Sequence, residues 1–395
     1  MLKMKEEALK IKEEIIKIRR LIHANPELGF EEWQTSKLVS AYLNSLGLEV
    51  QEGIAKTGVV GFLEGNNRNK VLAIRADMDA LPIQEQNKFE YKSKNKGKMH
   101  ACGHDAHTAM VLGVAKLLSK FKAELEGSVK FIFQPNEEQS KIPGGADTMI
   151  EEGVLENPRV EAILGIHVNP QIEVGSVGIK EGSIMAATDK FKIIVKGEGG
   201  HGAAPHETID AIIIAADIVQ NLQAIVSRRI SPVEPVVLTI GKVCGGESYN
   251  VIADEIQIEG TVRTVNPEIR EQIPMLMEQT IDGVTDIFGG DYRFDYQFGH
   301  SVLNNNRELT NLVTEVSKII IGEEKSIILK NPLMAGEDFA SYTKEVPGFF
   351  LHLGVKNSER KIYPWHHSKF NLDEEALPIG TAILAQSAIE YFKNV

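Results

Sequence analysis

The segment Met99–His107 carries one thiol and three imidazoles and leads directly into an apolar run with helical spacing. Thiolate sulfur and neutral imidazole nitrogen are ligands that zinc and other first-row metals prefer in proteins. Cys102 and His104 are close enough in sequence to bind one ion together. Either residue alone would be better explained as a buried thiol or a helix-capping imidazole. Their combination predicts a metal site, with His100 and His107 as packing groups or as groups that orient the ligands.

Two adjacent carboxylates supply the other groups that a hydrolytic metal centre needs. Glu137 and Glu138 follow the apolar run Val129–Phe133, and His167 comes at the end of a later apolar run. A solvated loop is the alternative for the two glutamates, but charge without a role is unexpected so close to a buried strand. One glutamate can bind metal while its neighbour accepts a proton from water. The pattern therefore favours hydrolysis.

The roles of three further groups stay open. His366 and His367 are adjacent, so we expect at most one of them to be a metal ligand, and spacing alone does not choose between them. Asp77 and Asp79 can be ligands, helix caps or carboxylates that orient a histidine, and the last role is favoured for Asp79. The pair Glu337–Asp338 has the same alternatives.

Short apolar runs that alternate with helical stretches predict an α/β sheet covered on both faces. Two helices, over 4–24 and 31–47, come first. Strands are expected at 59–63, 71–77, 129–134 and 162–167, with helices around 105–121 and 144–152. Ligands of such sheets bind at the carboxyl ends of the strands, where the candidate residues lie.

The pattern changes after about residue 186. Strands at 190–196, 236–243, 255–264 and 292–298, with helices at 209–228 and 267–288, give the order βαββαβ of a ferredoxin-like sandwich. From about 302 a helix–strand–helix pattern resumes and ends in a helix over 374–393. We therefore predict a discontinuous catalytic domain, 1–185 and 302–395, with an inserted domain over 186–301.

Composition and charge exclude several classes of protein. A chain of 395 residues favours two domains, and a net charge of −12 argues against a nucleic-acid partner. Met1–Arg20 resembles neither a signal nor a transit peptide, and no apolar run is expected to span a bilayer. With Cys102 and Cys244 as the two cysteines, a disulfide framework is excluded, so we expect a cytoplasmic protein without a membrane partner.

The segment Gly197–Gly202 matches the dinucleotide-binding pattern G-x-G-x-x-G between a strand and a helix. Pro205 and His206 separate these glycines from the apolar part of the helix, and no acidic residue ends a second strand about 20 residues on. We reject an NAD-dependent oxidoreductase on these grounds. The segment is instead expected to be a glycine-rich turn from which His201 projects.

Several motifs together resemble a known family. The segments Arg75–Pro82, His100–His107 and Phe133–Glu138 are similar to motifs of the dinuclear metallopeptidases that include aminoacylases, hippurate hydrolases, IAA-amino acid hydrolases and thermostable carboxypeptidases. Counterparts of four further segments occur in the same order and extend the resemblance over essentially the whole chain: Arg20–Leu28, Gly199–Gly202, Ala335–Phe339 and His366–Phe370.

The resemblance implies a zinc-peptidase-like α/β catalytic domain with an inserted ferredoxin-like α+β domain that serves as dimerisation domain and lid. Glu137 corresponds to the general base. His366 is preferred over His367 because the family's ligand lies four positions before the phenylalanine, here Phe370. More distant relatives have a histidine in place of Asp77. The metal ligands implied are Cys102, His104, Glu138, His167 and His366.

Residues of the inserted domain are also implied. His201 corresponds to the histidine that polarises the scissile carbonyl, in many relatives from the partner subunit. Asn250 and Arg263 correspond to residues that hold the substrate carboxylate.

The expected activity is hydrolysis of an amide bond in N-acyl-amino acids or at the C-terminus of short, often N-blocked peptides. Two divalent ions per subunit are expected, zinc first and manganese, cobalt or nickel as alternatives, in a homodimer or homotetramer. The rival function is a non-catalytic metal- or amino-acid-binding protein with the same fold.

Overall fold

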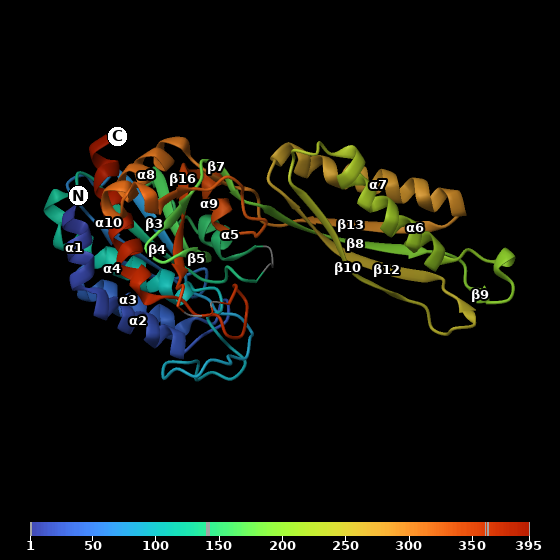
Figure 1. Ribbon diagram of the computed structural model, residues 1–395, viewed down its shortest axis with the longest axis horizontal. Helices are drawn as coiled ribbons and strands as arrows, with labels where there is room; N and C mark the ends of the chain where they lie inside the picture. The colour runs from blue at the N-terminus through green and yellow to red at the C-terminus, as the bar shows by residue number, and fades with distance from the viewer. Residues whose placement is uncertain (1, 140–142, 360, 362, 395) are drawn as a thin grey trace. The chain divides into compact units, whose positions relative to one another are not determined.

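The computed structural model describes residues 2–139, 143–359, 361 and 363–394 (Figure 1). The chain divides into two compact units. Unit 1 comprises Met1–Gly182, Asn304–Asn331 and Asp338–Val395, and unit 2 comprises Ser183–Leu303 and Pro332–Glu337. The short segment Pro332–Glu337 therefore returns to unit 2, where the sequence pattern placed it in the catalytic domain.

Unit 1 is built on an eight-stranded sheet with the order β1-β2-β4-β3-β5-β16-β6-β15. Its strands are β1 (Glu49–Ile54), β2 (Gly58–Leu63), β3 (Val71–Asp77), β4 (Ser128–Gln134), β5 (Ala162–Glu173), β6 (Val177–Ile179), β15 (Ser326–Ile328) and β16 (Gly348–Lys356). The central strands β4, β3, β5 and β16 are parallel. Nearly every residue of these four strands is buried, as expected for parallel strands covered on both faces.

Helices cover both faces of this sheet. One layer contains α2 (Lys12–Ala24), α3 (Trp33–Ser45), α4 (His104–Lys120) and α10 (Leu377–Asn394), with α1 (Leu2–Lys10) and α8 (Arg307–Ile321) packed against α10. The short helices α5 (Gly145–Glu151) and α9 (Phe339–Glu345) pack together and contact β4, β5 and β16. A large apolar core lies between the sheet and the α4–α10 layer.

The register of the sheet brings the candidate residues to one edge. Asp77 pairs with Gln134, and Arg75 pairs with Gly165, which places His167 level with Asp77. The carboxyl ends of β3 and β4 therefore meet beside His167. This is the edge at which ligands of parallel α/β sheets bind.

Two details differ from the sequence expectations for unit 1. The helix expected over 4–24 is interrupted at Ile11, which lies between α1 and α2 and caps the start of α2. The strand expected to end at His167 continues to Glu173, because β16 pairs with β5 beyond His167. His167 is thus an interior residue of a long strand rather than the end of a short one.

Unit 2 has the element order β8 (Ala187–Lys196), α6 (Ala211–Ala224), β10 (Val236–Gly245), β12 (Glu255–Thr264), α7 (Pro267–Phe288) and β13 (Asp291–Phe298). The four strands are antiparallel in the order β10-β12-β8-β13. This order is that of a ferredoxin-like sandwich. Both helices pack against the sheet, and their apolar faces form a separate core. β7 (Gly182–Met185) and β14 (Leu303–Asn305) lie where the chain passes between the units.

One segment, Ala211–Arg229, is long and apolar enough by length and composition to span a membrane, contrary to the sequence expectation. It consists of α6 and the following π-helical turn Ile225–Arg229. Ile214, Ile218 and Leu222 are buried in the core of unit 2. Packing against the sheet accounts for these three residues, whereas Ile212 and Ile213 of the same helix are about half exposed.

Candidate metal centre

Cys102 and His104 flank a glycine at the start of α4. Gly103 has a φ of 99°, a left-handed conformation that glycine adopts without strain. A Cβ atom on Gly103 would lie 2.3 Å from Cγ2 of Val168, in β5. Only glycine therefore allows the chain to turn so close to β5 and to present both neighbouring side chains to the same space.

One group of candidate ligands consists of Cys102, His104 and His167, all buried, with one ligand atom from each within 4.8 Å of the others. The Cys102 Sγ to His167 Nε2 distance is 3.4 Å. His167 Nδ1 lies 2.8 Å from the carbonyl oxygen of Val168 and donates to it, so Nε2 carries the lone pair. This tautomer leaves the Nε2 lone pair facing the Cys102 sulfur, where a metal ion could bind both atoms.

A second group contains Cys102 again, now with Glu138 and His366. Glu138 Oε2 lies 3.4 Å from His366 Nε2. The adjacent His367 instead stacks on Tyr363, with ring centroids 4.4 Å apart, and its Nδ1 accepts a hydrogen bond from the Lys369 amide. Of the two neighbouring histidines, His366 is the one directed towards the carboxylate.

Glu137 lies at the border of these groups. Its Oε2 is 3.9 Å from His104 Nε2, and its side chain is 10% exposed. It also forms a candidate group with His104 and Glu138. The two adjacent glutamates therefore both face His104, and Glu138 also faces His366.

The lone pairs of His104 and Glu138 show whether a metal cation fits between these side chains. His104 Nδ1 lies 3.0 Å from Asp79 Oδ1 and donates to it, which leaves Nε2 as a bare acceptor. His104 Nε2 and Glu138 Oε1 are 3.7 Å apart, and both are buried without a hydrogen-bond partner among the described residues. Two facing lone pairs in a buried site are unfavourable unless a positive charge lies between them. The donor set of thiol, imidazole and carboxylate fits a divalent metal.

Charge in the cluster leads to the same conclusion. Burial raises the pKa of the Cys102 thiol well above its usual value, and the nearby Glu138 carboxylate adds to this. Burial also raises the pKa of Glu138 to about 7. Burial lowers the pKa of His104, but the Asp77 and Asp79 carboxylates outweigh it and raise that pKa well above its usual value. These three shifts favour added positive charge, which protons can supply in the metal-free site and a bound cation supplies while keeping the ligands deprotonated. Burial instead lowers the pKa of His167 and of His366, which keeps both imidazoles neutral.

Asp79 holds two of the candidate ligands in place. Its Oδ1 accepts from His104, and its Oδ2 accepts a hydrogen bond of 2.9 Å from the Glu138 amide. One buried carboxylate thus fixes the tautomer of the histidine and the position of the glutamate. Carboxylates of this kind raise the basicity of a ligating histidine.

Asp77 has a different partner. His107 Nδ1 lies 2.6 Å from Asp77 Oδ1, and His107 Nε2 accepts a hydrogen bond from the Val168 amide. Both nitrogens of His107 are engaged, so it ties α4 to β3 and β5. Arg75 donates to Asp77 and to Asp338, which also accepts from Gln134. Asp338 is therefore part of a buried ion-pair network, a role that the sequence left open.

This network could have been anticipated in part. Arg75, Asp77 and Asp79 alternate along the end of one strand, and alternating residues share a face. An arginine beside two aspartates on one buried face must be paired. The partner of Asp77 could not be chosen from sequence, because His100, His104 and His107 were all available. His100 is buried with neither ring nitrogen partnered among the described residues, and burial lowers its pKa to about 4.

Similarity to known proteins identifies the family of this chain. A model of peptidase family M20/M25/M40 matches residues 73–390. The chain belongs to this family. It is 41% identical over 392 residues to thermostable carboxypeptidase 2 of Saccharolobus solfataricus, with 98% of each chain covered. It is also 41% identical over 379 residues to the N-acetylcysteine deacetylase of Bacillus subtilis, covering 96% of this chain and 97% of that protein.

A solved structure agrees with these relatives. The Bacillus subtilis YXEP protein, described as a dinuclear metal binding peptidase from the M20 family, superposes with a TM-score of 0.85 and 37% identity, covering 98% of this chain and 99% of that chain. These matches confirm the family, the fold class and the enzyme class predicted from the sequence. The protein is a hydrolase of the M20/M25/M40 metallopeptidases.

In this M20/M25/M40 hydrolase, His201 and Asn250 lie on neighbouring segments of unit 2. His201 belongs to β9 (Gly200–His201), which pairs with β11 (Val251–Ile252), and the Gly202 amide donates to the Asn250 carbonyl. The Ala203 amide donates to His201 Nδ1, so the neutral ring carries its proton on Nε2. His201 is exposed.

Arg263 lies elsewhere in unit 2. It is near the end of β12, whereas Asn250 and Val251 precede the start of that strand at Glu255. Eight residues of extended chain separate Glu255 from Arg263, about 25 Å. The structure therefore brings His201 and Asn250 together and places Arg263 at the opposite end of the sheet.

Proposed function

We propose that this protein hydrolyses the amide bond of N-acyl-amino acids, or releases the C-terminal residue of short N-blocked peptides, with two divalent ions in unit 1. The observation that carries the proposal is the pair of facing lone pairs on His104 Nε2 and Glu138 Oε1, with Glu137 beside them. Membership of a hydrolase family supports it. The relatives named carboxypeptidase and N-acetylcysteine deacetylase indicate the substrate class.

The ligand assignment follows the two groups. Cys102 belongs to both groups, so its thiolate would help to hold a divalent ion in this cluster. His104 and His167 complete one site, and Glu138 and His366 complete the other. Thiolate and imidazole favour zinc, and the imidazole–carboxylate set also accepts manganese, cobalt or nickel.

When bound, the metal ions supply the positive charge that acidifies a water molecule and stabilises the developing oxyanion. Glu137 accepts the proton of the attacking water and delivers it to the departing amine nitrogen. Its Oε2 lies 3.9 Å from His104 Nε2, within reach of the space that the candidate ligands surround. His201 donates its Nε2–H to the scissile carbonyl oxygen, and its tautomer is already fixed by the Ala203 amide.

Asn250 and Arg263 are proposed to hold the substrate carboxylate. A single N-acyl-amino acid is much shorter than the separation of about 25 Å along β12. His201 and Arg263 of one chain therefore cannot contact the same small substrate. We infer that a complete site takes His201 and Asn250 from one subunit and Arg263 from the other.

The surface of unit 2 supports a homodimer, with a homotetramer as the alternative. Ile212 and Ile213 on α6 are about half exposed, and Val243 on the edge strand β10 is similarly exposed. An exposed apolar helix beside an unpaired strand edge is typical of an interface.

A cytoplasmic location is proposed because the buried Cys102 thiol is free and needs reducing conditions to stay a ligand.

Hydrolysis of N-acetyl-, N-benzoyl- and N-blocked dipeptide substrates, with metal analysis of the same sample, tests the proposal. We expect turnover that is lost on chelation and restored by added metal and reductant. Stoichiometric metal binding without turnover of any substrate would favour the rival function, a non-catalytic binding protein.

A further inference from the structure

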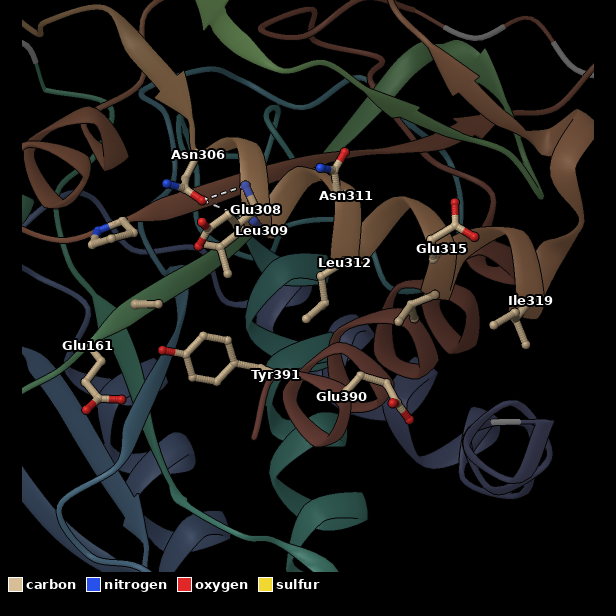
Figure 2. A pocket seen from close by; sticks show the side chains of 13 residues that line it. Glu161, Asn306, Glu308, Leu309, Asn311, Leu312, Glu315, Ile319, Glu390 and Tyr391 are labelled. Carbon is tan, nitrogen blue, oxygen red and sulfur yellow. Dashed lines mark hydrogen bonds between the residues drawn. The ribbon is translucent and has the colours of Figure 1, made fainter. Parts of the chain in front are cut away.

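A cavity of about 750 Å³ lies in unit 1 between α8 and α10 (Figure 2). Ala162, the first residue of β5, lines it, as does Pro347 just before β16. His167 is five residues further along β5, about 16 Å away. The cavity is therefore at the opposite edge of the sheet from the metal centre and is a separate feature.

Its floor is apolar. Leu309, Leu312, Val316 and Ile319 follow one stripe of α8 and line the cavity. Leu309 and Val316 are buried, but Ile319 is 41% exposed. An aliphatic surface in a concave site favours a ligand with an apolar body.

Tyr391 supplies a polar group without a partner. It is 6% exposed, and its hydroxyl has no hydrogen-bond partner in the part of the chain that the structure describes. In Figure 2 its hydroxyl is directed to the end of the cavity where Glu161 and Glu308 lie. Burial, aided by Glu161, raises the pKa of Tyr391 to about 12, so the hydroxyl keeps its proton. A hydroxyl that opens into a cavity can accept a hydrogen bond from a cationic ligand that fills it.

The charged groups of the cavity are all acidic. Glu161, Glu308, Glu315 and Glu390 line it, and none of the described residues that line it is a lysine, arginine or histidine. Glu315 pairs with Lys318 at 2.8 Å, and Glu390 pairs with Lys393 at 3.1 Å. Glu161 and Glu308 form no side-chain ion pair with any described residue. The uncompensated negative charge is thus at the same end as the Tyr391 hydroxyl.

We propose that this cavity binds a small organic cation, an amine or guanidine on a short apolar chain. The chain packs on the Leu309–Ile319 stripe of α8. The cationic head pairs with Glu161 and Glu308 and donates a hydrogen bond to the Tyr391 hydroxyl oxygen. Charge complementarity selects the cation, and the stripe selects against small hydrophilic ions.

Calorimetric titration of the full-length protein with hexylamine, hexan-1-ol and hexanoate tests this proposal. The three probes share the apolar chain and differ in charge. We expect saturable binding of hexylamine, binding of the alcohol weaker by about tenfold, and no binding of hexanoate. Equal affinities for the amine and the alcohol, or no saturable binding of the amine, would overturn the proposal.

Variants locate the binding. Glu161→Gln with Glu308→Gln should weaken hexylamine binding by about tenfold or more, and Tyr391→Phe should weaken it several-fold. Glu315→Gln is the matched control, because that carboxylate lines the same cavity but is already paired with Lys318. The control should bind like the parent. Unchanged binding in the double variant would show that the amine binds elsewhere.

Discussion

At the residue scale, the metal centre depends on which nitrogen of each histidine carries its proton. Asp79 fixes His104, the Val168 carbonyl fixes His167, and the Val168 amide with Asp77 fixes His107. The first two tautomers leave Nε2 as a lone pair. The third uses both ring nitrogens and removes His107 from the ligand set.

Asp79→Asn tests this dependence. The variant keeps an oxygen for His104 but places an amide N–H opposite the Glu138 amide, so one hydrogen bond is lost and the ligands shift. We expect metal affinity to fall by about 10–100-fold in chelator competition. Asp286→Asn, at an exposed position of α7, is the control and should match the parent. Parent-like affinity in Asp79→Asn would contradict the orienting role.

The sequence predicted the types of these residues better than their partners. Cys102, His104 and the two glutamates are recognisable because thiol, imidazole and carboxylate cluster around predicted strand ends. The tautomers and the separate roles of Asp77 and Asp79 depend on a fraction of an ångström in side-chain placement. Such geometry is set by tertiary packing and is not encoded in spacing.

At the element scale, the start of α4 determines how two ligands are presented. Gly103→Ala should strain the left-handed backbone and drive a methyl group against Val168, 2.3 Å away. The matched control is Gly97→Ala, which has a φ of 75° but no atom within 4 Å of the added carbon. We expect Gly97→Ala to cost about 1–2 kcal/mol of unfolding free energy and to retain metal. Gly103→Ala should cost more and lose metal, and equal effects in both variants would contradict the steric argument.

The first turn of α4 is also tied to α2. Asp105 Oδ2 accepts hydrogen bonds from Arg19 Nε at 2.7 Å and His23 Nδ1 at 2.8 Å, and all three side chains are buried. Asp105→Asn leaves the Arg19 charge without its closest partner. We expect a loss of about 3–5 kcal/mol in unfolding free energy at pH 7, measured by urea denaturation. The exposed pair Arg293–Asp295 provides the control, since Asp295→Asn should cost about 0–1 kcal/mol.

The stabilisation that the buried Asp105–Arg19 pair provides depends on pH. Burial raises the pKa of Asp105, but Arg19 and His23 outweigh it and hold that pKa far below its usual value. Its stabilisation is therefore present above the unfolded pKa of about 3.9 and is lost as the pH falls below it. The difference between parent and Asp105→Asn should shrink from pH 5 to about pH 3. A difference that grows with acidity would contradict this assignment.

Elements with strong periodicity were predictable, and interruptions were not. The apolar pattern over 4–24 continues through Ile11 without glycine or proline, so nothing local marks the break between α1 and α2. β5 continues beyond His167 because β16, nearly 200 residues later in the chain, pairs with it. Long-range pairing of this kind extends a strand beyond its local signal.

At the scale of the whole molecule, the ferredoxin-like order of unit 2 was readable from its alternating helices and strands. The return of Pro332–Glu337 to unit 2 was not, because the segment is too short to carry periodicity. The separation of His201 from Arg263 along β12 also emerged only from the pairing of strands. That separation underlies the proposal that two subunits share each site.

Subunit exchange tests the shared site. His201→Ala and Glu137→Gln homodimers should each have very low activity, with His201→Ala lowering kcat more than it raises KM. After exchange, each hybrid dimer should contain one site with both residues intact, so about a quarter of all sites recover. Mixing without exchange is the control. No recovery after demonstrated exchange would place His201 in its own subunit's site.

The most direct test of the central claim is the metal content and turnover of Glu137→Gln and Glu138→Gln, measured side by side. The two residues are adjacent, similarly buried and equally close to His104, so a general effect on folding would change both variants alike. We predict that Glu137→Gln keeps parent-like metal and loses about 10²–10⁴-fold in kcat. Glu138→Gln should lose metal as well as activity. Equal metal loss in both variants, or near-normal turnover in Glu137→Gln, would contradict the assignment of base and ligand.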